Sequence, residues 1–214
     1  MGRTAAPAVL REPLSVIFGA RGRVAVLRVL AFSLAPLSGR EVARRARLSA
    51  RGAQLALGDL ELLGVVTTID GGRDRLASVN RAHVLWTIID AAFRAEAECY
   101  SALRAAIARA VAPSDDLVSV VLFGSTARGE EQMESDLDIA IIGRTDGAAS
   151  AAVDRVLAHG DALRARFGVR VAPVGWSVGA AKSGLAAKRP PFRELLSDGV
   201  LVAGRPLSES LRAP

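Results

Sequence analysis

Residues 117–142 read LVSVVLFGSTARGEEQMESDLDIAII, and this stretch decides how the second half of the chain is interpreted. The apolar run Leu117–Phe123 predicts a short strand that ends at the pair Gly124-Ser125. Ten residues follow that pair, and Asp136 and Asp138 then alternate with apolar residues. Because successive side chains of a strand point to opposite faces, we expect the two carboxylates to share one face of a sheet. The apolar residues between and after them would face the core.

Two ionised carboxylates this close repel each other unless a cation or a proton neutralises them. Carboxylate oxygens are ligands that Mg²⁺ prefers, and Mg²⁺ commonly combines one or two of them with substrate phosphates. Mn²⁺ is the alternative ion for such oxygen ligands. The turn at Gly124-Ser125 would offer backbone N–H groups to those phosphates. The segment therefore predicts a site for a metal ion and a nucleotide.

The string GSTARGEEQMESDLDIAII resembles the minimal nucleotidyltransferases of the polymerase-β superfamily, whose signature is Gly-Ser followed at this spacing by Asp-x-Asp. The resemblance is strong over residues 117–142 and weak from there to residue 204. It implies an α/β (α+β) fold with a small mixed sheet and a nucleoside triphosphate as substrate or ligand. It also implies site residues: Asp136 and Asp138 as catalytic metal ligands, Gly124 and Ser125 at the outer phosphates, and Arg128 near a phosphate. For Arg128, solvation or pairing with Glu130 or Glu131 is an equal alternative.

One feature of the resembling family is missing. Its active members have a third acid on a later strand, which corresponds to Ala172 within the predicted strand GVRVAPV, residues 168–174. No Asp or Glu occurs anywhere from Ala162 to Arg193. The second metal ion and the general base therefore have no evident residue. Asp154 and Asp161 could replace the missing acid only with unusual geometry.

The composition indicates a soluble globular protein. Of 214 residues, 50% are hydrophobic and 23% are charged, which is ordinary for globular domains. Since no apolar run is long enough to span a bilayer, and the N-terminus does not resemble a signal peptide, we expect no membrane association. Cys99 is the only cysteine, which fits a reducing cytoplasm.

The basic residues are unevenly distributed. Residues 1–83 contain 13 arginines and 6 acids, a net charge of +7, whereas residues 84–214 contain 15 basic residues and 16 acids, a net charge of −1. A bias toward Arg codons would explain why arginine replaces lysine, but not this asymmetry. A basic first domain favours a phosphate-backbone partner.

The first part of the chain has a pattern of its own. We expect a helix over Gly22–Phe32, a second helix capped by Ser38 with Glu41, and a third helix from Ser49 to Leu63. Gly64 would end the third helix, and strands over residues 65–69 and 76–80 would flank a hairpin turn. This order, over residues 38–83, resembles winged helix-turn-helix DNA-binding domains.

The resemblance implies which residues would contact double-stranded DNA. In the third helix, Leu55, Leu60 and Leu63 are expected to face inward, which leaves outward side chains to meet base edges. Residues near the turn and on the wing would contact phosphates. The predicted DNA-contacting residues are Arg51 and Gln54 on the helix, Arg44, Arg45 and Arg47 near the turn, and Arg73 and Arg75 on the wing. Such domains also serve as protein–protein or dimerisation modules, so a homodimer is one arrangement to consider.

We therefore expect three segments: a winged helix-turn-helix domain (1–83), a linker helix (84–112) and a nucleotidyltransferase-like domain (113–214). The long helix at 83–111 would be a spacer, a dimerisation helix or a helix packed on the following domain. Our first interpretation is a Mg²⁺-dependent nucleotidyltransferase with a DNA-binding winged helix. The alternatives are a DNA-binding transcriptional regulator whose degenerate domain senses a nucleotide or is inactive, and a non-catalytic member of a toxin–antitoxin pair.

Overall fold

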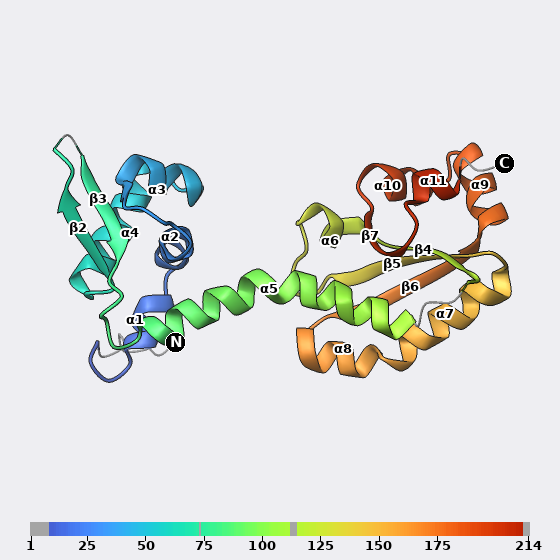
Figure 1. Ribbon diagram of the computed structural model, residues 1–214, viewed down its shortest axis with the longest axis horizontal. Coiled ribbons are helices and arrows are strands. Elements are labelled where there is room, and N and C mark those ends of the chain that lie inside the picture. Colours follow the sequence, from blue (N-terminus) through green and yellow to red (C-terminus); the bar gives the residue numbers. More distant parts are fainter. Residues whose placement is uncertain (1–8, 73, 112–114, 212–214) are drawn as a thin grey trace, which may run out of the picture. The chain divides into compact units, whose positions relative to one another are not determined.

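The computed structural model describes residues 9–72, 74–111 and 115–211, and the chain forms two compact units, Met1–Ala97 and Glu98–Pro214 (Figure 1). We call them the N-terminal and C-terminal units. Within the described residues, none of the helices has the length and apolar character that crossing a membrane requires.

The N-terminal unit combines helices with a small antiparallel sheet whose strand order is β1-β3-β2. Its elements are α1 (Pro13–Phe18), α2 (Arg21–Ala31), β1 (Leu37–Ser38), α3 (Gly39–Arg45), α4 (Ala50–Leu62), β2 (Val66–Asp70), β3 (Arg75–Val79) and the first part of α5 (Trp86–Val111).

Local capping sets the helix boundaries of this unit, as the sequence predicts. The Ser38 hydroxyl accepts a hydrogen bond from the Glu41 backbone N–H (3.3 Å), and the Ser49 hydroxyl accepts one from Gly52 (3.0 Å). Gly64 follows α4 with a positive φ of 72°, a conformation that favours glycine. The order of α2, α3, α4, β2 and β3 is the expected one; α1 and β1 were not expected.

Of the three leucines expected to face inward along α4, Leu60 is buried and Leu63 packs against the core, but Leu55 does not face inward. Leu55 is 61% exposed, and the residues that α4 buries are Ala53, Ala56 and Leu60. Ala56 lies against Gly22 of α2, where a side chain on Gly22 would begin 3.7 Å from the Ala56 Cβ atom. These small residues let the two helices approach closely, and the larger Leu55 is left on the outer face.

The C-terminal unit is built on a four-stranded mixed sheet of order β6-β5-β4-β7. Strand β4 pairs antiparallel with β5 and β7, whereas β5 and β6 are parallel. After α5, its elements are β4 (Leu117–Leu122), α6 (Gly124–Arg128), β5 (Asp136–Gly143), α7 (Asp146–Ala158), α8 (Gly160–Phe167), β6 (Arg170–Ser177), α9 (Val178–Ala186), α10 (Phe192–Ser197), β7 (Val200–Gly204) and α11 (Leu207–Ser210).

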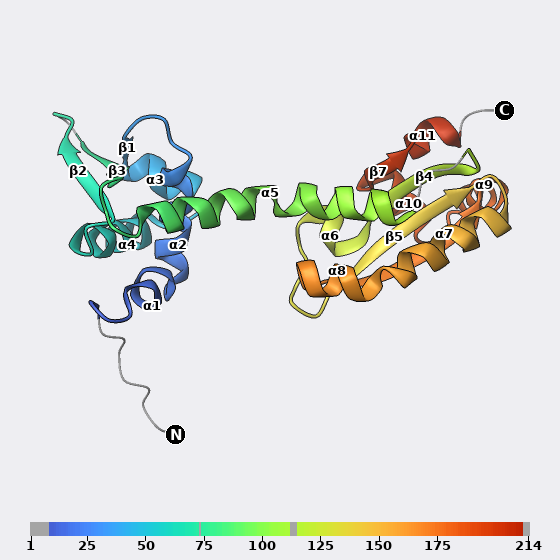
Figure 2. The same ribbon diagram turned by 60° about the horizontal axis from the view of Figure 1, so that its bottom comes forward.

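Helices cover both faces of this sheet, as Figures 1 and 2 show. The end of α5 packs with α7 and α8 against Leu137, Ile139 and Ile141 of β5. On the other face, α9, α10 and α11 pack against Ala140 and Ile142. The alternation predicted for β5 is therefore present, and the side chains of Asp136 and Asp138 share the face of α9–α11. The mixed α/β architecture with a small sheet agrees with the expected fold class.

Three segments of this unit differ from the sequence expectation. From their sequence, residues 147–167 would be expected to form one helix, but they lie in two helices, α7 and α8, which meet at His159-Gly160. The predicted strand at 168–174 is β6, which starts at Arg170 and extends to Ser177, and helix α9 follows it without having been expected.

Helix α5 contributes to the cores of both units. Trp86, Ile89 and Phe93 are buried in the N-terminal unit, and Leu103, Ile107 and Val111 are buried in the C-terminal unit. Side chains 94–101 between them are all exposed, including Cys99.

Candidate functional site

The two halves of the signature meet at one end of the C-terminal sheet. Strand β4 ends at Leu122, and the backbone N–H of Phe123 donates a hydrogen bond to the carbonyl of Asp138 (3.1 Å). Gly124 has a positive φ of 71°, and a side chain there would begin 2.2 Å from Oδ2 of Asp138. Two separate features therefore require glycine at position 124: its backbone conformation, and the Asp138 carboxylate that occupies the space of a side chain.

Asp138 lies in an environment that disfavours its charge. Partial burial raises the pKa of the Asp138 carboxyl above its ordinary value, and the negative charges of Asp136 and Glu194 raise it further. Glu194 belongs to α10, which covers the same face of the sheet. Such a carboxylate gains from a nearby cation, because the cation relieves both the desolvation and the repulsion.

Asp136 has a different neighbour, Arg170. The Arg170 Nε–H donates to Oδ1 of Asp136 in a short ion pair. These residues are the first of β5 and the first of β6, and they are register partners in the parallel pairing. The same register places Ala172 beside Asp138. The position that the family resemblance assigns to a third acid is therefore next to Asp138, and it is occupied by a methyl group.

These residues fit one divalent ion. Asp138 supplies carboxylate oxygens whose charge is uncompensated, and Asp136 supplies a second carboxylate on the same face. They do not fit a pair of ions. Within the ranges that the structure describes, no group of three or more His, Cys, Asp or Glu side chains is arranged to hold a metal, and one Asp136 oxygen already accepts from a guanidinium.

The other predicted phosphate-side residues lie on the short helix α6. Ser125 is in its first turn, and its carbonyl accepts a hydrogen bond from the Glu130 N–H (2.9 Å), which closes the turn behind α6. Arg128 donates from Nε to Oε2 of Glu130 (2.8 Å). Of the two roles considered for Arg128, the structure shows the pairing with Glu130.

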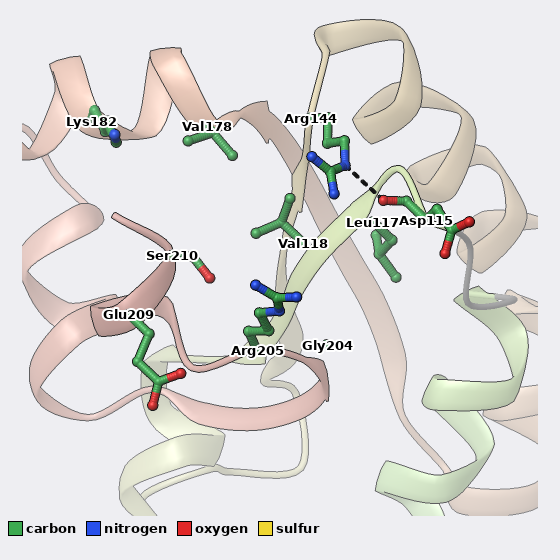
Figure 3. Close-up of a pocket in the computed structure, with 10 residues that line it drawn as sticks. All are labelled: Asp115, Leu117, Val118, Arg144, Val178, Lys182, Gly204, Arg205, Glu209 and Ser210. Carbon is green, nitrogen blue, oxygen red and sulfur yellow. Dashed lines mark hydrogen bonds between the residues drawn. The ribbon is translucent and has the colours of Figure 1, made fainter. Parts of the chain in front are cut away.

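Two cavities of the C-terminal unit lie near opposite ends of the sheet. One, of about 380 Å³, is lined by Ser135, Arg164 and Arg170 among others, and so borders the signature. The larger one, of about 670 Å³, is lined by Val118 at the start of β4, by Arg144 after β5 and by Arg205 after β7 (Figure 3). It does not include any residue of the signature.

The predicted DNA-contacting residues of the N-terminal unit divide into two groups. Three are held by acids: Arg44 and Arg45 both pair with Glu41, and Arg75 pairs with Glu61. Glu41 accepts from Arg44 at 2.5 and 2.8 Å and from Arg45 at 2.5 Å, and these bonds lower the pKa of its carboxyl to about 2.

The second group is exposed without such a pair. Arg51 and Gln54 are exposed on α4, and Arg47 is exposed in the turn between α3 and α4, with a positive φ of 53°. Gln54 and Arg75 also line a cavity of about 560 Å³ between α3, α4 and the β2–β3 hairpin. Arg73 lies outside the described residues.

Arg170 and Glu194 are neighbours of the site that were not predicted from the sequence. Alternation along the predicted strand at 168–174 would have placed Arg170 on the same face as Ala172. The parallel register with β5, which brings Arg170 to Asp136, has no signature in the sequence. Glu194 is the first acid after the acid-free stretch, and only the packing of α10 brings it near Asp138.

Part of the C-terminal unit is similar to a known family. Residues 105–167 match the family model described as "Nucleotidyltransferase domain". The matched segment runs from within α5 to the end of α8, so it includes Gly124, Ser125, Asp136 and Asp138 and stops before β6. Residues 105–167 are therefore similar in sequence to nucleotidyltransferase domains, and the mixed α/β fold of the unit agrees with that similarity.

Comparisons over larger parts of the chain give weak likenesses. A structure described as a toxin–antitoxin with AMP-PNP is 20% identical, with a TM-score of 0.32, over 50% of this chain and 74% of that one. Human N-acetylserotonin methyltransferase in complex with SAM is 21% identical, with a TM-score of 0.29, over 53% of this chain and 38% of that one. Neither likeness is strong enough to support a functional conclusion. No curated protein matches the chain.

Proposed function

We propose that the chain is a Mg²⁺-dependent nucleotidyltransferase that transfers a nucleoside monophosphate from a nucleoside triphosphate to an acceptor, and that its N-terminal unit binds double-stranded DNA. The nucleotidyltransferase part of this proposal depends on one observation: the Asp138 carboxylate lies against Gly124. The aspartates that would bind the metal ion are therefore next to the Gly-Ser turn that would bind phosphate. The match of residues 105–167 to the nucleotidyltransferase domain supports the same reaction class.

Each residue of the signature has a distinct part in this proposal. Asp136 and Asp138 would hold Mg²⁺ or Mn²⁺. The bound ion would neutralise part of the negative charge of the triphosphate. Gly124 leaves room for the Asp138 carboxylate and for a close phosphate. The first turn of α6 has no side-chain cap, so the Ser125 backbone N–H and hydroxyl can donate to the outer phosphates. Arg128 would reach a phosphate only by leaving Glu130.

The test of nucleotide binding is calorimetry with Mg²⁺ and non-hydrolysable analogues of the four common triphosphates. The native chain should bind at least one of them, and Asp136→Asn/Asp138→Asn should not. A matched control is Asp154→Asn/Asp161→Asn, which removes two exposed acids from α7 and α8 and should leave binding unchanged. Equal binding by the native chain and by the signature variant would reject the site.

A second candidate function is a DNA-binding regulator that binds a nucleotide without turnover. The pairing of Arg170 with Asp136 and the presence of Ala172 beside Asp138 favour it, because together they leave no residue for a second metal ion or a general base. Incubation with α-labelled triphosphates and with candidate protein, nucleic acid and small-molecule acceptors separates the two. Transfer of label establishes the enzyme, whereas binding without label on any acceptor favours the regulator.

The DNA-binding part of the proposal depends on the N-terminal unit alone. Its support is the net charge of +7 over residues 1–83 and the exposed Arg47, Arg51 and Gln54 near and on α4. Binding to a random-sequence duplex should weaken steeply with salt, because each phosphate contact releases a counterion. Arg51→Ala should weaken it and Arg109→Ala, an exposed arginine of α5 in the C-terminal unit, should not.

A further inference from the structure

We propose that Arg170 is a built-in cation of the candidate nucleotide site. Its guanidinium takes the role that a second divalent ion would otherwise have beside Asp136, so the site binds a triphosphate together with a single divalent ion. This inference rests on the proposed binding of nucleotide at Gly124–Asp138, and it concerns how that site balances charge.

The backbone sets the position of Arg170. Asp136 and Arg170 are register partners at the start of two parallel strands, and their side chains are joined by an ion pair. Partners on adjacent strands point to the same face of the sheet and lie about 5 Å apart. The guanidinium is therefore beside Asp136 because of the strand pairing, and the contact is not a chance meeting of two long side chains.

The negative charge that the chain offers to metal ions at this place is limited. Asp136, Asp138 and Glu194 contribute three negative charges and Arg170 contributes one positive charge, a net charge of −2, and Ala172 adds none. An acid in place of Arg170 or of Ala172 would make the same face considerably more negative. Two divalent ions a few ångströms apart repel each other strongly, and carboxylates that bridge them normally offset this repulsion. Here a guanidinium in contact with Asp136 adds to the repulsion instead.

The ion pair between Arg170 and Asp136 contributes little to the stability of the fold. The Arg170 side chain is 70% exposed and that of Asp136 is 39% exposed, and pairs this exposed contribute little to stability. Arg170 also lines the cavity of about 380 Å³ that borders the signature, together with Ser135 and Arg164. A guanidinium in this position can turn from the carboxylate to a phosphate oxygen, for which its planar donors are well suited.

The test counts manganese ions by electron paramagnetic resonance, first with Mn²⁺ alone and then with a bound non-hydrolysable triphosphate. With Mn²⁺ alone, Arg170→Gln should bind about threefold more tightly than the native chain, because the ion no longer competes with the guanidinium for Asp136. Arg170→Lys should remain close to native. With nucleotide, the native chain should bind one Mn²⁺ per nucleotide, and Arg170→Gln/Ala172→Asp should bind two.

The matched control is Arg164→Gln, which removes one exposed arginine from the wall of the same cavity. It should leave the Mn²⁺ affinity at the native value. Two ions per nucleotide in the native chain would overturn the inference, and so would equal Mn²⁺ affinities in native, Arg170→Gln and Arg164→Gln proteins. If the native chain binds no nucleotide, the proposed function fails, while the comparison with Mn²⁺ alone still decides the role of Arg170.

Discussion

At the scale of single residues, Gly124 and Gly129 allow the signature turn to be tested. Both have positive φ, 71° and 67°, but only at Gly124 would a side chain meet Asp138. Alanine at either position should destabilise the fold by about 1 kcal/mol through backbone strain. Only Gly124→Ala should also abolish binding of Mg²⁺ and nucleotide, as measured by calorimetry. Equal loss of binding in both variants would show that the turn matters only through its backbone.

The two aspartates of the signature should respond differently to neutralisation. Burial and neighbouring charges raise the pKa of Asp138 from 3.8, so its ionised form is less favourable in the folded chain than in the unfolded one. The fold therefore loses stability as the pH rises through the interval between the ordinary and the raised pKa, and this loss persists at neutral pH.

Asp138→Asn should accordingly raise the melting temperature of the ligand-free protein at pH 7 by about 1–2 °C, while removing nucleotide binding. The shift is small because the site is only partly buried. Asp136→Asn should give no such gain, since Asp136 already has Arg170 as a partner. A melting curve of the Asp138 variant that is unchanged, or shifted downward, would contradict the electrostatic account of this residue.

At the scale of elements, helix α3 keeps two of its arginines in ion pairs with its own Glu41, so these arginines are not available to contact another molecule. Glu41 pairs with Arg44 and Arg45, and its pKa of about 2 means that it releases them only in strong acid. The stability that this cluster adds is present above the ordinary pKa of 4.5 and is lost as the pH falls toward 2.

Glu41→Gln should therefore strengthen binding of a random DNA duplex at low salt and make its salt dependence steeper, because two more arginines become available to phosphates. Glu96→Gln is the matched variant: it releases Arg28 from an ion pair of the same unit, away from the predicted contacts. Fluorescence anisotropy over a range of salt concentrations measures both. An equal gain in the two variants would mean that only net charge matters.

Elements with local signals are the ones that the sequence predicts well. Ser38, Ser49 and Gly64 mark helix ends through hydrogen bonds or backbone conformations that involve only near neighbours. The alternation predicts that Leu137, Ile139 and Ile141 are buried on the face opposite Asp136 and Asp138; beyond Asp138 the structure buries both faces of β5, because Ala140 and Ile142 pack under α9–α11.

Elements that depend on tertiary packing are the ones that the sequence does not predict. Helix α9 contains Gly179 and Gly184, which lower helix propensity. Gly184 is nevertheless required, because a side chain there would begin 2.1 Å from the ring of Phe192 on α10. The parallel register that brings Arg170 to Asp136 is likewise a long-range pairing with no local pattern. Half of the candidate site was therefore predictable, and the charge balance around Asp136 was not.

At the scale of the whole molecule, α5 is the element that the two units share. It is one helix from Trp86 to Val111, and its exposed middle, residues 94–101, contains no Gly or Pro. An event in one unit can affect the other only if the states of the two units are thermodynamically coupled. The regulator candidate requires such coupling, whereas the enzyme candidate does not.

If the chain is a regulator, bound Mg²⁺ and nucleotide should change its affinity for DNA by about fivefold or more. Bound DNA must then change the affinity for nucleotide by the same factor, because the coupling free energy is shared.

Ala97→Pro, in the exposed middle of α5, should abolish both changes in affinity while leaving each separate affinity near its native value, since proline interrupts the helix without touching either core. Ala97→Ser keeps the helix and should keep the coupling. Anisotropy for DNA and calorimetry for nucleotide supply the two factors independently. If, in the native chain, nucleotide does not change the affinity for DNA and DNA does not change the affinity for nucleotide, the regulator is rejected. Transfer of label to an acceptor would then establish the enzyme.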